Sequence, residues 1–68
     1  MPVVKVLEIV GESTESWADA VSNCVKEVAA RIPSLSGVEV LNWTANVENG
    51  QIVKYKANVK VAYLDDAR

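Results

Sequence analysis

The stretch that decides the fold is IVKYKANVKVAY, residues 52–63, in which polar and apolar side chains alternate. Lysine and asparagine occupy positions 54, 56, 58 and 60, and valine, alanine and tyrosine occupy the positions between them. A period of two predicts a half-buried strand, because successive side chains point to opposite faces of a sheet. One face of this strand should pack on a core, and the other should meet solvent or a partner.

The segment before it predicts the neighbouring strand. VEVLNWTANV, residues 38–47, is rich in β-branched residues, and Asn49-Gly50 between the two segments is typical of a two-residue hairpin turn. In the simplest hairpin Glu39 lies opposite Lys60, Leu41 opposite Asn58, and Trp43 opposite Lys56. Paired residues share a face. The polar face should then carry Gly37, Glu39, Leu41, Trp43, Lys54, Lys56, Asn58 and Lys60.

The N-terminal half predicts one more strand and one helix. Residues 3–10, VVKVLEIV, are β-branched and apolar and stop at Gly11. Apolar residues then recur at spacings of three and four from Trp17 to Ile32, which predicts an amphipathic helix that Pro33 ends. Ser13 or Thr14 is expected to cap it. The chain is therefore predicted to be one α+β domain, residues 1–68, in the order strand, helix, strand, strand.

Composition argues against several classes of protein. Cys24 is the only cysteine and there is no histidine, so an intrachain disulfide is excluded and a tetrahedral zinc site is disfavoured. The formal charge of −2 argues against nucleic-acid binding, which needs a basic face. No apolar run approaches the roughly 20 residues of a membrane span, and the N-terminus lacks the regions of a signal peptide. We expect a cytoplasmic protein with no membrane partner.

The short chain predicts self-association. A domain of about 60 residues buries only about 60 % of the surface of its unfolded chain, so its own core is marginal. Small domains usually add disulfides, a structural metal or oligomerisation. With the first excluded and zinc disfavoured, a homo-oligomer is expected.

No catalytic constellation is evident. The chain has no histidine to act as a base near neutral pH, no nucleophile elbow and no glycine-rich phosphate loop. Cys24 lies on the apolar stripe of the helix without a basic neighbour, so it is expected to pack as a small hydrophobic residue. We expect a binding protein and not an enzyme.

The order and spacing of these segments resemble the dodecin family. KVLEIVGES leads into the helix, and GVEV, ENG and YKANVKVAY follow it, over about residues 4–65. The resemblance implies a βαββ subunit whose three-stranded antiparallel sheet wraps around the helix. It also implies that twelve copies form a hollow shell, with helices outside and sheets lining the interior. Most members of the family bind flavins in pairs, which suits storage of FMN or riboflavin.

Three ligand-binding positions of that family are altered. The stacking tryptophan is replaced by Gly37, the glutamine at the flavin edge by Lys56, and an arginine further along the second strand by Thr44. Each lost aromatic partner costs about 1 kcal/mol, and an ammonium cannot accept the hydrogen bonds of an amide. The resemblance therefore implies weakened flavin binding. Other candidates to line the interior are Glu39, Trp43, Lys54, Asn58 and Lys60.

Two features of the polar face allow more than one interpretation. The lysine row, Lys54, Lys56 and Lys60, could bind an anionic ligand. Alternatively, its members could form ion pairs across strands, with Glu39–Lys60 the clearest pair. Trp43 could supply a stacking ring from a neighbouring subunit, or it could pack in a subunit contact. We favour the second interpretation of each feature.

A branch of the family described as calcium dodecins is also similar to this chain. Its members share a Ser-Trp at the start of the helix, as at Ser16-Trp17, and lack the stacking tryptophan. Calcium takes six to eight oxygen ligands, and Glu8, Glu39 and Glu48 could supply carboxylates at a symmetry axis. No EF-hand spacing is present, so the metal ligands stay unassigned. Three hypotheses remain open: a flavin-binding shell, a calcium-binding shell, and a structural shell without flavin.

Overall fold

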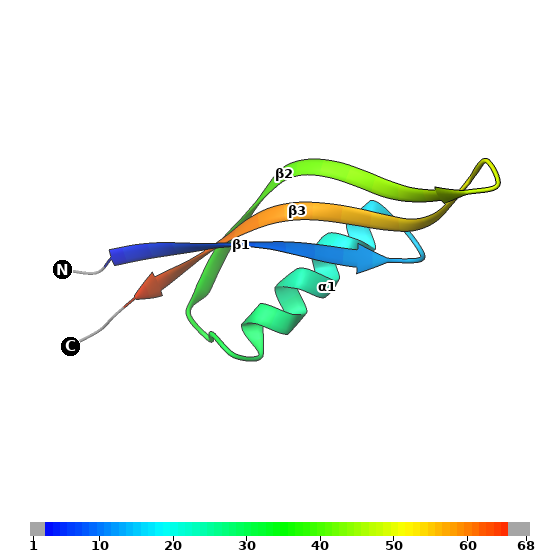
Figure 1. Cartoon of the computed structure of the whole chain (residues 1–68). Coiled ribbons are helices and arrows are strands. Elements are labelled where there is room, and N and C mark those ends of the chain that lie inside the picture. Colours follow the sequence, from blue (N-terminus) through cyan, green and yellow to red (C-terminus); the bar gives the residue numbers. More distant parts are fainter. Residues whose placement is uncertain (1–2, 66–68) are drawn as a thin grey trace.

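The computed structural model describes residues 3–65. They form β1 (Val3–Ser13), α1 (Trp17–Ala29), β2 (Leu35–Glu48) and β3 (Gln51–Asp65). The strands make one antiparallel sheet in the order β1-β3-β2, and α1 packs across one face of it (Figure 1). This confirms the predicted α+β fold, βαββ with a three-stranded antiparallel sheet around one helix. Within the described residues, no helix is long and apolar enough to cross a membrane.

The core lies between α1 and the central strand. Ala20, Cys24 and Val28 of α1 and Ala57, Val59 and Val61 of β3 are buried together. Cys24 and Val28 belong to the apolar stripe that the sequence predicts, and the three β3 residues belong to its predicted apolar face, whereas Ala20 was not expected in the stripe. β1 approaches the helix at Gly11, where an added Cβ would collide with the carbonyl oxygen of Ala20 and with Cys24 Sγ. The predicted stop at Gly11 is wrong, because the missing side chain permits a close contact while β1 continues to Ser13.

The ends of the helix also differ from the prediction. Ser16, and not Ser13 or Thr14, is the N-cap, and its Oγ accepts a hydrogen bond from the amide of Asp19 at 3.0 Å. Ser13 instead closes the preceding turn: its Oγ accepts from the amide of Glu15 at 2.8 Å and donates to Asp19 Oδ2 at 2.7 Å. The helix ends at Ala29, and Ile32 packs against the core from the turn that follows.

The register of β2 on β3 departs from the simplest hairpin in the middle of the strands. Glu39 faces Lys60 as predicted, but an irregularity between Val40 and Asn42 leaves Leu41 unpaired with β3. Trp43 then faces Ala57, so the predicted pairs Trp43–Lys56 and Leu41–Asn58 are wrong. One extra residue in a strand turns every following side chain to the other face. Trp43 therefore shares the helix side of the sheet with buried Ala57.

The β2–β3 hairpin extends beyond the part of the sheet that pairs with β1. A second irregularity between Asn46 and Val47 restores the predicted register, and Asn49 and Gly50 form the turn with φ of 53° and 74°. Positive φ at both central residues is what the Asn-Gly turn predicts. β1 pairs with β3 only from Tyr55 onward. Residues 46–54, the hairpin extension, therefore form a two-stranded ribbon that projects past α1 and β1 (Figure 1).

Candidate functional site: the open face of the sheet

The open face is the side of the sheet that α1 does not cover. Because Ala57, Val59 and Val61 turn toward the helix, the alternate residues of β3 point away from it. Cross-strand pairing assigns their neighbours in β1 and β2 to the same face. The open face thus brings together seven of the predicted site residues: Gly37, Glu39, Thr44, Lys54, Lys56, Asn58 and Lys60. It does not include Trp43.

Charges on this face alternate in sign across the strands. Lys60 lies between Glu8 of β1 and Glu39 of β2 in register. Lys54 Nζ lies 3.3 Å from Glu12 Oε1, with both side chains largely exposed. Exposed pairs of this kind contribute about 0–1 kcal/mol, so their effect is to cancel charge more than to hold the sheet. The lysine row is therefore part of a mixed-charge surface and not a basic patch.

Sequence reasoning named Glu8 as a candidate carboxylate but missed Glu12 and the register that places both beside the lysines of β3. It identified the Glu39–Lys60 pair from the hairpin turn, but nothing in the sequence fixes the register of β1 on β3. The even spacing of Glu8 and Glu12 was the available signal, since it places both glutamates on one face of a strand.

A hollow on the open face surrounds Gly37. Its volume is about 250 Å³, and it is lined by Val6, Gly37, Val38, Glu39, Lys60 and Ala62. A Cβ added at Gly37 would meet no atom within 4 Å. The position where the family resemblance puts a stacking tryptophan is thus open space in this chain.

The three altered ligand positions are not adjacent within one chain. Thr44 and Lys56 are direct cross-strand partners, whereas Gly37 pairs with Ala62. Ala62 lies six positions after Lys56 in β3, or about 20 Å away at about 3.3 Å per residue. A single ligand that contacts all three positions would need side chains from more than one chain.

Trp43 lies in an aromatic cluster on the helix side. Its ring centroid is 6.2 Å from that of Trp17, with the rings at 79°, and Trp17 stands at 78° to Tyr55 at 4.8 Å. Trp17 Nε1 donates a hydrogen bond to the carbonyl oxygen of Thr44 at 2.8 Å. Trp43 remains 51 % exposed. Placing Trp43 on the polar face was therefore wrong, because the irregularity at Leu41 has no sequence signal.

The described residues form no metal site by themselves. Within residues 3–65, no group of three or more histidine, cysteine, aspartate or glutamate residues is placed to hold a metal ion. Glu8 and Glu39 lie on either side of Lys60, and Glu48 lies in the hairpin extension. A calcium ion that used all three carboxylates would have to lie between chains.

The pKa values of Lys5 and Cys24 are perturbed, and both side chains lie away from the open face. The hydrogen bond and ion pair with Asp65, at 2.8 Å, raise the pKa of the Lys5 ammonium above its ordinary value. Burial raises the pKa of the Cys24 thiol. Cys24 is therefore a protonated core side chain at neutral pH and not a nucleophile.

Comparison with protein-family models matches residues 3–65 to the family described as Dodecin. The chain belongs to the dodecin family. This confirms the resemblance found in the sequence. No curated protein sequence matches this dodecin.

Solved structures show the same fold. Dodecin from Streptomyces coelicolor superposes with a TM-score of 0.94 at 24 % identity, over 98 % of this chain and 96 % of that one. Dodecin from Streptomyces davaonensis gives 0.90 at 26 % identity, over 97 % of each chain. The calcium-chelating antigen from Mycobacterium tuberculosis described as a calcium dodecin, with a novel calcium-binding site, gives 0.81 at 24 % identity, over 97 % and 96 %.

Proposed function

We propose that this dodecin is a cytoplasmic, homo-oligomeric binding shell and not an enzyme, with twelve copies that enclose the open faces of their sheets. The observation that supports assembly is the large solvent-exposed area of the single chain. A compact monomer of 7.4 kDa should expose about 4,200 Å². This chain exposes 4777 Å². Because its charges are mixed, the open face suits a small ligand or ion better than a nucleic acid.

The character of the exposed surface supports the same proposal. Large apolar side chains that are 39–61 % exposed occur on all three strands, and Val4, Val47 and Leu64 are examples. Among residues 3–65, by contrast, the buried core contains no side chain larger than valine. A domain with so small a core needs further apolar burial, which neighbouring copies can supply.

Size-exclusion chromatography with multi-angle light scattering tests the assembly. We expect one species of about twelve times the 7.4 kDa chain mass. A species with the mass of one chain would contradict the proposed shell. An assembly of another size would contradict only the number twelve.

We propose a flavin as the first ligand, bound weakly on the open face. The hollow at Gly37 supplies space for a planar ring but no aromatic side chain to stack on it. Lys56, beside Thr44, is a donor in place of an amide. Because Gly37 and Lys56 of one chain lie about 20 Å apart, Gly37 of one copy and Lys56 of another would contact the same ring, and Asn58 and Lys60 would line the open face around it.

A riboflavin fluorescence titration tests the flavin site. Saturable quenching with the wild-type shell is expected. Gly37→Trp with Lys56→Gln should tighten binding about fivefold or more, because a stacked ring contributes about 1 kcal/mol. Gly37→Ala with Lys56→Gln is the matched control, which restores the amide without the ring. Equal affinities for the two double variants would count against stacking at position 37.

Calcium is the second candidate, and the open-face carboxylates favour it. Glu8 and Glu39 project from different strands on one face, and the fold matches that of the calcium dodecin. We propose that Ca²⁺ would bind where such carboxylates from several chains meet, with water completing its six to eight oxygen ligands.

Thermal unfolding in CaCl₂ and in EGTA separates this candidate from the first. Ca²⁺ at 100 times its Kd should stabilise the folded protein by about 2.7 kcal/mol. The gain should shrink in Glu8→Gln and in Glu39→Gln, and Mg²⁺ should not reproduce it. An identical melting temperature in CaCl₂ and EGTA would remove calcium from consideration. With no response to riboflavin either, a structural shell would be the remaining hypothesis.

A further inference from the structure

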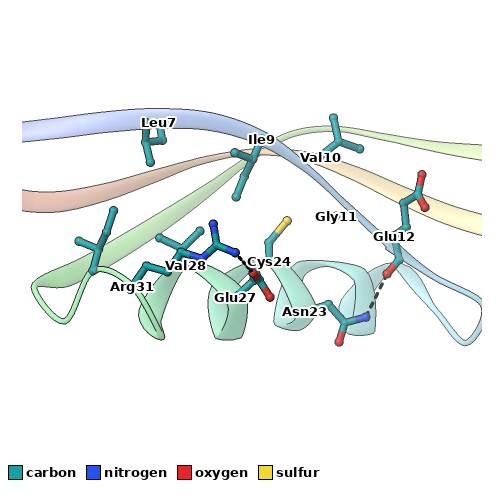
Figure 2. Close-up of a pocket in the computed structure, with 11 residues that line it drawn as sticks. Leu7, Ile9, Val10, Gly11, Glu12, Asn23, Cys24, Glu27, Val28 and Arg31 are labelled. Atoms are coloured by element: carbon teal, nitrogen blue, oxygen red, sulfur yellow. Dashed lines mark hydrogen bonds and ion pairs between the residues drawn. The ribbon is translucent and has the colours of Figure 1, made fainter.

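An apolar groove lies between β1 and α1, on the side of the sheet that faces the helix. Its volume is about 440 Å³, and the α1–β1 groove is lined at its base by Leu7, Ile9, Cys24, Val28 and Ile32. Figure 2 shows Leu7 and Ile9 pointing from β1 toward the helix, with the Cys24 sulfur directed up between the two elements. β1 is an edge strand, so the groove is open along one side.

The polar groups around this groove already have partners. Glu27 and Arg31 form an ion pair at 2.8 Å, and Glu12 is paired with Lys54 at 3.3 Å. Asn23 Nδ2 donates to the carbonyl oxygen of Glu12 at 3.0 Å (Figure 2). An apolar occupant would therefore cover no uncompensated charge, which would be costly to bury. A charged ligand, in contrast, would have to compete with these pairs.

The hairpin extension carries exposed apolar side chains that could fill such a groove. Residues 46–54 have no third strand and no helix over them, and an isolated two-stranded hairpin is at best marginally stable in water. Val47, Ile52 and Val53 in this segment are 61 %, 44 % and 39 % exposed. These apolar side chains lie at the end of the molecule that projects farthest from the core, so only another molecule can cover them.

We propose that the hairpin extension of one copy docks in the α1–β1 groove of the next copy, in a head-to-tail contact. The inference rests on the proposed homo-oligomer and names its contact surface. Within one chain the extension points away from the groove, so the contact must be between copies (Figure 1). A head-to-tail contact that closes forms a ring around a rotation axis, in which every extension and every groove is used.

Site-directed crosslinking tests this contact. Val47→Cys marks the extension and Arg31→Cys marks the rim of the groove, in a Cys24→Ala background, with a short bismaleimide as the crosslinker. Arg31 and Val47 are both exposed, so neither change disturbs the core. Glu27→Gln accompanies Arg31→Cys, so that no unpaired carboxylate is left beside the groove. Chains with both cysteines should give a denaturing-gel ladder that ends at the ring size. The two single-cysteine proteins should crosslink to a covalent dimer only after they are co-assembled.

The alternatives give different results in the same experiment. Crosslinking of Val47→Cys by itself would mean that extensions meet one another, and it would overturn the head-to-tail contact. A correctly sized oligomer without crosslinks would overturn the contact and leave the proposed shell standing. A monomer in light scattering would contradict both. If Cys24→Ala lowers the yield of oligomer, the experiment is repeated with Cys24 present. Any crosslink made by Cys24 would then appear in the proteins that carry only Val47→Cys or only Arg31→Cys.

Discussion

Gly11 is the residue at which β1 comes closest to α1. An added Cβ would collide with the Ala20 carbonyl, a backbone group of a helix that cannot move aside. Gly11→Ala should therefore lower the free energy of unfolding by about 1–3 kcal/mol, as overpacking does, although alanine normally favours ordered structure over glycine. The midpoint of urea unfolding measures this change.

Gly37→Ala is the matched control for that substitution. A Cβ there meets no atom within 4 Å, so the free energy of unfolding should stay the same or rise by about 0.5 kcal/mol. Similar losses at the two positions would show that glycine is needed for its backbone freedom and not for the contact with α1.

Cys24 gives a pH dependence whose sign follows from its burial. Burial raises the pKa of the folded thiol above its ordinary value of 9.0. Below pH 9 the folded and unfolded chains both hold the proton, so the full stability is present. As the pH rises through 9 the unfolded chain loses its proton first, and stability falls until the folded pKa is passed.

Urea unfolding at pH 7, 8, 9 and 10 measures that dependence. The wild type should lose up to about 1.4 kcal/mol per pH unit more than Cys24→Ala above pH 9. Lys5, whose pKa is raised from 10.5, contributes equally to both proteins and cancels in the difference. Parallel curves for the two proteins would mean that the thiol is not desolvated.

At the scale of the element, helix α1 begins at a cap that the sequence did not single out. Ser16 Oγ accepts the Asp19 amide, whereas Thr14 lies in the preceding bend. Ser16→Ala should cost about 1 kcal/mol of the free energy of unfolding, and Thr14→Ala less than about 0.5 kcal/mol. Thermal unfolding of the two variants distinguishes them. A larger loss from Thr14→Ala would support the sequence-based assignment of the cap.

The helix and the strands could be predicted because each buries one face, and burial of one face makes apolar residues recur with the period of that element. The apolar set of β3 and the apolar stripe of α1 meet in the core as expected. The predicted pair Glu39–Lys60 is found because the two register shifts between it and the Asn49-Gly50 turn cancel. The irregularity at Leu41 could not be predicted, since no residue type requires it. It decides on which face Trp43 lies, so the predicted face of the sheet is confirmed for Lys56 and wrong for Trp43.

The shape of the molecule and the size of its core both favour the proposed assembly with other copies. The chain extends 53 Å along its longest axis and 13 Å along its shortest, although it is only 68 residues long. An elongated layer of one helix and three strands buries little of its own surface. Its folding and its assembly should therefore be coupled in one equilibrium, with no stable folded monomer.

Coupled folding and assembly make the melting temperature depend on protein concentration. Tenfold dilution of a twelve-chain shell should lower the free energy of unfolding by roughly 1.3 kcal/mol per chain, because dissociation accompanies unfolding. For a domain of this size, that corresponds to a fall of about 5–10 °C in melting temperature. Slow thermal scans by circular dichroism over a hundredfold range of concentration measure it. A melting temperature that is constant over that range would mean that each chain folds independently, and the exposed apolar surface would then need another explanation.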